Sequence, residues 1–197
     1  MIKIKNNFRL ALSKIALLIL EKNSSENKNN FPQVAVFSFD YISNCIQIYG
    51  QYEKSLLKKL KETLEKNTSN DLIIDVGANI GNHSLYFSTF FRKVMSLEPN
   101  PKVFQLLKIN SSLVNNIECL NVGASSEKGN LDFYINNRNL GGSRVVGLSD
   151  KIISNSQIEV VKIDDLDFNG LKPACIKIDV EGHEWSVIKG CEKILSK

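Results

Sequence analysis

The chain has 197 residues, of which 43% are hydrophobic, and its 25 basic and 21 acidic residues leave a net charge of +4. This size suits one domain with a core of its own, and the scattered lysines argue mildly against nucleic acid as an obligatory partner. The four cysteines form no C-x-x-C pair and have no histidines at zinc-ligand spacing, which indicates a reduced, cytoplasmic setting without a zinc site.

An apolar segment near the start is followed by a polar one. "LALSKIALLIL" is interrupted by Ser13 and Lys14 and is shorter than the roughly 20 residues of a membrane span, so we expect no transmembrane helix. No small-x-small cleavage site follows it, which argues against a signal peptide. We predict an amphipathic helix that packs on the domain or a partner, with weak contact to a membrane surface as the alternative. Residues 1–30 are then a helix with a polar, asparagine-rich linker from residue 21, and residues 31–197 are the main domain.

A β-hairpin and a helix are predicted next. "VAVFSFDYISNCIQIY" alternates and is rich in β-branched residues, which predicts two short strands around a turn near Ser43 and Asn44. In "YEKSLLKKLKETLEK" the leucines share one helical face, and its lysines are therefore interpreted as a solvated face. These leucines are Leu56, Leu57, Leu60 and Leu64.

Four short aliphatic runs have the form of buried parallel strands. They are residues 71–76, 93–98, 117–122 and 174–180, with a helical period over 100–113. This alternation of strand and helix predicts an α/β fold with a doubly wound sheet. Before the fourth run, "LDFYI" and "IEVVKI" are predicted strands on either side of a long polar loop. In that loop Ser143 and Arg144 are candidate acceptor contacts of a lid, and a bare surface loop is the alternative.

The loop "DVGANIGNHS" joins the first strand to the next helix. Gly77 and Gly81 would let the backbone approach a ligand closely because neither carries a Cβ. A dinucleotide fingerprint requires glycine where Asn79 stands, and Asp75 would repel a pyrophosphate, so a nicotinamide-dependent oxidoreductase fits the fold but not the loop. The acid instead favours the cationic sulfonium and ammonium of S-adenosylmethionine. A tight strand-to-helix turn without a ligand is the alternative.

Two further strand ends carry polar residues that would complete a nucleoside site. Glu98, after the second run, is placed to accept both ribose hydroxyls, and Asn121, after the third, to hydrogen-bond the adenine edge. The structural alternative makes Glu98 a surface acid before a proline turn and Asn121 a strand cap. The joint placement at three strand ends favours the cofactor site.

The fourth run ends in "KIDVEGHE", which supplies the candidate catalytic residues. Methyl transfer requires an acceptor oxygen aligned with the methyl carbon and, for an alcohol, removal of its proton. We expect Asp179 or Glu181 to orient the acceptor and take His183 as a candidate base. The alternatives are that the acids stabilise the following helix and that His183 is merely exposed. A divalent cation would also suit oxygen ligands, but the spacing does not establish one and we assign no metal ligands.

"DVGANIGNHS", "LEPNP", "NVGAS" and "IKIDVEGHE", in this order, resemble the FkbM family of S-adenosylmethionine-dependent methyltransferases over about residues 45–195. The resemblance implies a Rossmann-like class I methyltransferase sheet, with Asp75, Gly77, Asn79 and Gly81 forming the cofactor loop. It also implies methyl transfer to a hydroxyl of a small molecule or sugar. Members usually continue after "DVEGHEWSVIKGCEKIL" with a further strand and a closing hairpin. We therefore expect the sheet to lack its last strands. A shortened domain that binds cofactor or partner without turnover is the alternative function.

Overall fold

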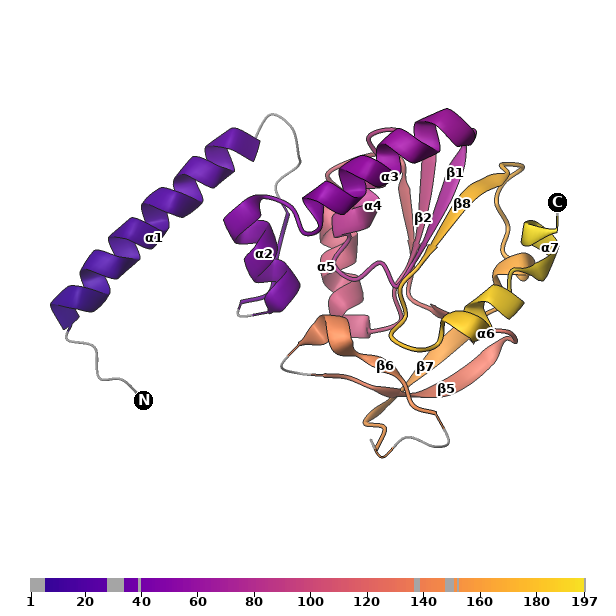
Figure 1. Ribbon diagram of the computed structural model, residues 1–197. Helices are drawn as coiled ribbons and strands as arrows, with labels where there is room; N and C mark the ends of the chain where they lie inside the picture. The colour runs from indigo at the N-terminus through magenta and orange to yellow at the C-terminus, as the bar shows by residue number, and fades with distance from the viewer. Residues whose placement is uncertain are drawn as a thin grey trace.

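Two sheets form the centre of the fold in the computed structural model, which describes residues 6–27, 34–38, 40–136, 139–147, 151 and 153–196 (Figure 1). The main sheet has four parallel strands in the order β3-β2-β1-β8. They are β1 (Leu72–Val76), β2 (Lys93–Leu97), β3 (Ile117–Leu120) and β8 (Pro173–Ile178). All four lie where aliphatic runs predict them, and all five residues of β1 are buried, as expected of a central parallel strand. The Rossmann-like fold class is confirmed.

Helices cover both faces of this sheet, and the alternation of side chains along β1 divides the core between them. Ile73 faces α3 and α4 and packs against Leu57 and Phe87. Leu72, Ile74 and Val76 face the other way, into a cluster with residues of α6 and the segment after it. The helices are α3 (Lys54–Asn67), α4 (Asn82–Phe87), α5 (Pro101–Ser111), α6 (Glu184–Lys189) and α7 (Glu192–Leu195). Of the four leucines predicted to share a face of α3, Leu56 lies outside it and is exposed.

The second sheet lies below the first in Figure 1 and has the order β4-β7-β5-β6. Its strands are β4 (Gly123–Ala124), β5 (Gly129–Tyr134), β6 (Arg144–Val145) and β7 (Ser156–Val161). β5 and β7 pair antiparallel, which confirms the two strands predicted there. The polar loop between them contains the 3-10 turn η1 (Leu140–Gly142) as well as β6, and a second turn, η2 (Ile163–Asp165), follows β7.

The predicted β-hairpin is wrong. Its second half is the helix α2 (Tyr41–Tyr49), and its first half contains no described strand residue. The side chain of Asp40 accepts a hydrogen bond from the Ser43 backbone N–H at 3.1 Å, so it caps the start of the helix, and Gly50 ends it in a left-handed conformation. Ile46 packs from α2 into a buried cluster beside the cavity described below.

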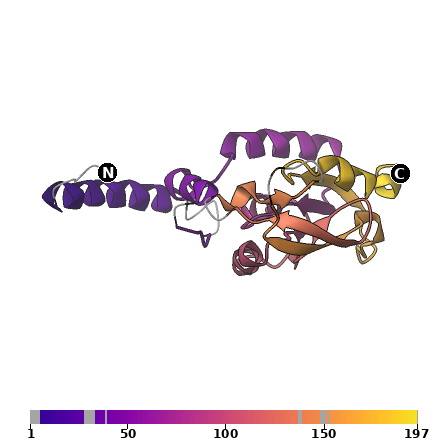
Figure 2. The same ribbon diagram turned by 90° about the horizontal axis from the view of Figure 1, so that it is seen from below.

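The N-terminal helix α1 (Asn6–Asn27) lies beside α2 and projects away from the two sheets (Figures 1 and 2). It continues to Asn27, so the prediction of a linker from residue 21 is wrong for 21–27, because an established helix gains a hydrogen bond with each added residue. Residues 28–30 lie outside the described ranges, and the domain boundary at residue 30 stays a prediction.

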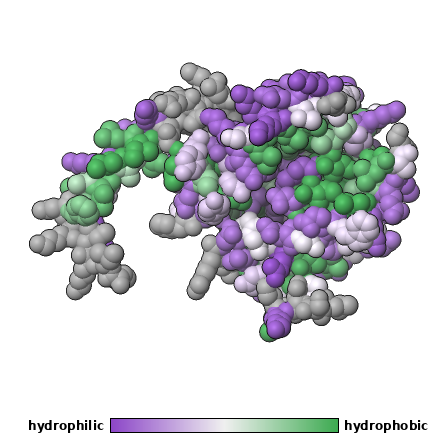
Figure 3. All heavy atoms as spheres, in the orientation of Figure 1, coloured by the Kyte–Doolittle hydropathy of each residue, from purple (hydrophilic) through white to green (hydrophobic). Residues whose placement is uncertain are grey.

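The apolar side chains of α1 remain uncovered, as the green surface at the left of Figure 3 shows. They are Phe8, Leu10, Leu12, Ile15, Leu17, Leu18 and Ile19. Within the described ranges, no helix is long and apolar enough to cross a membrane. Weak contact of α1 with a membrane surface stays a prediction.

Candidate functional site

A cavity of about 390 Å³ opens at the carboxyl ends of β1, β2 and β8. Its wall is built from the loop after β1, the end of β2, the loop after β8, the turn before α3, η1 and the apolar face of the second sheet. This volume and this position are typical of small-molecule sites in open α/β sheets. The residues predicted for cofactor and catalysis can therefore be placed relative to one cavity.

The glycine loop after β1 packs closely against the ends of β2 and β8. The backbone N–H groups of Gly77 and Ala78 both donate to the carbonyl oxygen of Leu97 at 3.0 Å. Gly77 has a φ of +75°, and a Cβ at this position would overlap the carbonyl oxygen of Asp179. Gly77 and Asn79 line the cavity.

Gly81 supports the loop from behind the cavity. It immediately precedes α4 with a φ of +92°, and a Cβ there would meet Leu107 Cδ1 at 3.0 Å. It is not among the described residues that line the cavity. The second predicted glycine therefore serves the close packing of the loop on α5.

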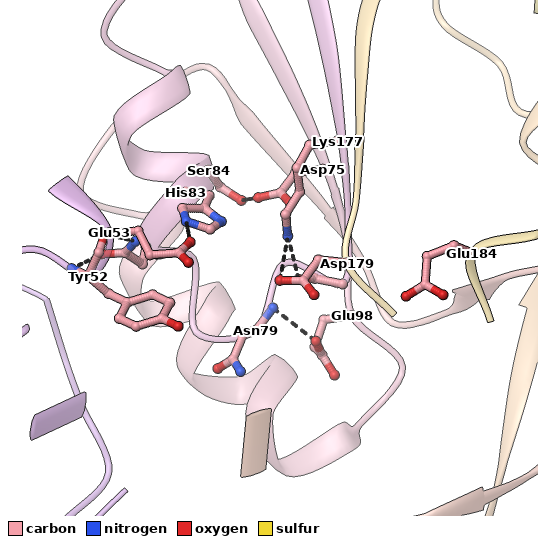
Figure 4. Close-up of polar contacts among 12 residues, drawn as sticks. Tyr52, Glu53, Asp75, Asn79, His83, Ser84, Glu98, Lys177, Asp179 and Glu184 are labelled. Atoms are coloured by element: carbon pink, nitrogen blue, oxygen red, sulfur yellow. Dashed lines mark hydrogen bonds and ion pairs between the residues drawn. The ribbon is translucent and has the colours of Figure 1, made fainter. Parts of the chain in front are cut away.

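Asp75 is fully buried beneath the loop and is held by neighbours within the protein. Lys177 Nζ lies 3.0 Å from its Oδ1, and the Ser84 hydroxyl donates to its Oδ2 at 2.6 Å (Figure 4). Lys177 also donates to the Gly77 carbonyl oxygen at 3.0 Å. Burial raises the pKa of Asp75, but the charge of Lys177 and the hydrogen bond from Ser84 outweigh it and hold this pKa below its usual value. Asp75 is therefore ionised and paired, and it is not among the described residues that line the cavity.

Glu98 lies in the cavity wall with both carboxylate oxygens in use. Oε2 accepts from the Asn79 backbone N–H at 2.9 Å and Oε1 from the Asn100 backbone N–H at 2.8 Å. Each oxygen keeps a second lone pair for a ligand hydroxyl. Burial raises the pKa of Glu98 to about 7, against the lowering effect of the two hydrogen bonds.

Asn121 is not among the described residues of the cavity wall. Its amide nitrogen donates to the backbone oxygens of Glu98 at 2.8 Å and Pro99 at 3.2 Å. Glu98 therefore lies in the cavity wall, whereas Asn121 stabilises the turn at Glu98 and Pro99 through hydrogen bonds to its backbone.

The loop after β8 brings all three predicted catalytic residues to the cavity: Asp179, Glu181 and His183. Asp179 Oδ2 lies 3.7 Å from Lys177 Nζ. His183 Nε2 lies 3.0 Å from the Ser125 hydroxyl oxygen, and burial lowers the pKa of this half-buried imidazole. In the described ranges, no group of three or more His, Cys, Asp or Glu side chains is arranged to hold a metal ion.

A second groove, of about 820 Å³, runs along β5 and β6 and shares Val145, Glu181 and His183 with the cavity. Arg144 lies in this groove, whereas Ser143 lines the cavity itself. The two residues predicted for a lid are therefore divided between adjoining spaces.

Sequence reasoning missed the turn before α3. Tyr52 and Glu53 line the cavity, although they precede the glycine loop by more than twenty residues. His83, the second residue of α4, also lines the cavity, and its Nε2 lies 3.1 Å from Glu53 Oε2. In the sequence, this turn is followed by a segment that predicts only an amphipathic helix. No residue spacing indicates that the turn lies beside the glycine loop.

Comparison with known proteins gives related sequences and partial structural likenesses. Residues 75–197 match the methyltransferase FkbM domain. The hexuronic acid methyltransferase AglP of Haloferax volcanii is 34% identical over 135 residues, which are 67% of this chain and 54% of that protein. The chain thus spans about half the length of this relative.

Two solved structures overlap the chain in part. Precorrin 8W decarboxylase of Methanobacterium thermoautotrophicum is 23% identical, with a TM-score of 0.30 over 36% of this chain and 39% of that one. The YcgJ protein of Bacillus subtilis is 15% identical, with a TM-score of 0.27 over 32% of this chain and 29% of that one.

Proposed function

The chain belongs to the FkbM methyltransferase family, and we propose that it binds S-adenosylmethionine in the cavity and transfers the methyl group to a hydroxyl of a sugar. The sugar acceptor is supported by the name of the relative, a hexuronic acid methyltransferase. The position of Glu98 supports binding of the nucleoside part of the cofactor, because its two carboxylate oxygens can accept hydrogen bonds from both ribose hydroxyls.

The charge of the cavity wall carries this proposal. Four carboxyl groups line it: Glu53, Glu98, Asp179 and Glu181. Among the described lining residues, Lys177 is the one lysine or arginine, and it is already paired with the buried Asp75. Such a wall favours a cationic ligand and disfavours the pyrophosphate of a dinucleotide.

The acceptor would lie where the cavity meets the second groove. We propose that Asp179 and Glu181 orient the acceptor hydroxyl and that His183 takes its proton. The lowered pKa of His183 leaves the imidazole neutral at pH 7, which is the form a base requires. If Ser125 accepts a hydrogen bond from Nε2–H, Nδ1 is the free acceptor nitrogen. The bound cofactor supplies the electrophilic methyl group.

The cytoplasmic location also belongs to the proposal. It is supported by the four free cysteines, because free thiols persist in reducing compartments.

Cofactor binding is tested by thermal and chemical unfolding with ligand. S-adenosylmethionine at 100 times its dissociation constant should add about 2.7 kcal/mol to the free energy of unfolding. NADH at the same concentration should add nothing. Transfer of a labelled methyl group to uronic acids or neutral sugars then tests turnover. Tight nicotinamide binding without S-adenosylmethionine binding contradicts the proposal, and cofactor binding without transfer would leave a non-catalytic binding domain.

Cofactor affinity should depend on the ionisation of Glu98. Because its pKa is about 7, a proton occupies the carboxyl group below that pH and removes the better acceptor of two hydroxyls. We expect the dissociation constant to rise by up to about tenfold per pH unit below 7, measured by calorimetry. Glu98→Gln should bind weakly at pH 8 and lose this dependence. The exposed substitution Glu62→Gln should keep it.

The same group makes a prediction for stability without ligand. The folded pKa of Glu98 lies above its unfolded value, so the folded state binds more protons between pH 4.5 and 7. Its contribution to stability is present below pH 4.5 and is lost as the pH rises through 7, by up to about 3 kcal/mol. Urea unfolding of Glu98→Gln should lack this decline. A decline of equal size in Glu98→Gln would contradict the assignment.

A further inference from the structure

The turn before α3 is fixed to the glycine loop by one buried amide. Asn82, the first residue of α4, accepts from the Tyr52 backbone N–H at 3.1 Å and donates to the Tyr52 carbonyl oxygen at 3.0 Å. Both hydrogen-bonding groups of this backbone unit are therefore satisfied by a single side chain. The adjacent Glu53 is held at a defined place in the cavity wall.

Glu53 adopts a conformation that a glutamate rarely takes. Its φ of 55° lies in the left-handed region, which costs a residue with a side chain of the order of 1 kcal/mol or more. The carboxylate is one-third exposed and lies 3.1 Å from His83 Nε2. Burial lowers the pKa of His83, so its imidazole is neutral at pH 7 and leaves the charge of Glu53 uncompensated.

At the end of the cavity near Glu53, acidic side chains outnumber basic ones. Glu53, His83 and Tyr52 lie together in Figure 4, and His83 is near enough to Lys177 and Asp179 for their charges to act on its pKa. Lys177 serves both the buried Asp75 and Asp179, at 3.0 and 3.7 Å. One lysine therefore faces two aspartates, and Glu53 has no positive partner among the described residues.

We propose that Glu53 binds the α-ammonium group of the methionine part of the cofactor, the role that the sequence suggested for Asp75. The inference rests on the proposed function. Glu98 marks the ribose end of the cavity, and Figure 4 places Asn79 between Glu98 and Glu53. A cofactor whose ribose lies on Glu98 thus carries its amino acid part across the glycine loop toward Glu53. Asp75 is excluded from this role because it lies buried on Lys177 and Ser84.

The test compares two ligands that differ only in the ammonium group. S-adenosylhomocysteine and its deaminated analogue, in which hydrogen replaces the amino group, are titrated by calorimetry. Glu53→Gln should weaken binding of S-adenosylhomocysteine at least tenfold, the loss typical of a charge-assisted hydrogen bond. Binding of the deaminated analogue should change less than about threefold. Glu65→Gln, an exposed acid of α3, is the matched control and should change neither.

A second variant separates binding from folding. Glu53→Gly relieves the left-handed strain, so it should unfold at higher urea concentration than the wild type while it loses the same selectivity for the ammonium ligand. Equal loss for both ligands in Glu53→Gln, or no loss in either variant, overturns the assignment and leaves cofactor binding intact. If the wild-type chain binds neither ligand, the proposed function fails together with it.

Discussion

Replacing Gly77 by alanine should remove cofactor binding and about 3 kcal/mol or more of unfolding free energy. The new Cβ would overlap the backbone carbonyl oxygen of Asp179. A backbone atom cannot move away by a rotamer change, as the end of a flexible side chain can. The φ of +75° adds the cost of a left-handed alanine. The loops after β1 and β8 would have to separate, which breaks the contact of Lys177 with the Gly77 carbonyl oxygen. Urea unfolding and titration with S-adenosylhomocysteine measure both effects.

Gly170→Ala is the matched control for this substitution. Gly170 has a nearly identical φ of +78°, but nothing lies within 4 Å of its added Cβ. It should therefore lose only the conformational cost, about 1 to 2 kcal/mol, and should bind the ligand normally. If the two variants behave alike, the close approach of the two loops does not shape the cavity.

The fold could be predicted wherever burial alone determines the structure. The four aliphatic runs lie where the strands of the main sheet form, and β1, an inner strand of that sheet, is buried along its whole length. The segment that forms α2 was ambiguous, because Ile42 and Ile46 fit the spacing of a helix as well as a β-branched strand. Its structure depends on the cap from Asp40 and on packing of Ile46 against Ile80 and Val103. The packing contacts are distant in sequence, whereas the cap by Asp40 is a local signal that the hairpin prediction overlooked.

The site was predictable where strand ends meet. Glu98 and the loop at 179–183 reach one cavity because parallel strands end at the same edge of the sheet. Asp75 does not reach it, because side chains alternate along β1 and its carboxylate faces α4, on the side of Ile73. Glu53 lines the cavity beside Tyr52, whose backbone is held by the hydrogen bonds of Asn82, and the order of residues along the chain does not reveal this contact.

Replacing Lys177 by methionine should destabilise the protein by about 3 to 5 kcal/mol at pH 7. The substitution keeps most of the side-chain volume but leaves Asp75 charged and fully buried without its cation. Lys193→Met is the control, because Lys193 and Asp165 form an exposed pair at 3.8 Å and should contribute less than about 1 kcal/mol. Urea unfolding at pH 7 compares the two variants.

The pH dependence shows whether the charge of Asp75 is the cause. In the wild type its folded pKa lies below the unfolded value, so its stabilisation is present at neutral pH and is lost as the pH falls through the folded pKa. Without Lys177, burial should raise this pKa above its usual value, which reverses the sign: protonation then stabilises the folded variant. The difference between wild type and Lys177→Met should therefore narrow as the pH is lowered toward 4. Adding Asp75→Asn to the variant should recover much of the loss at pH 7, and a difference that persists at every pH would show that Lys177 acts through packing and not through this pair.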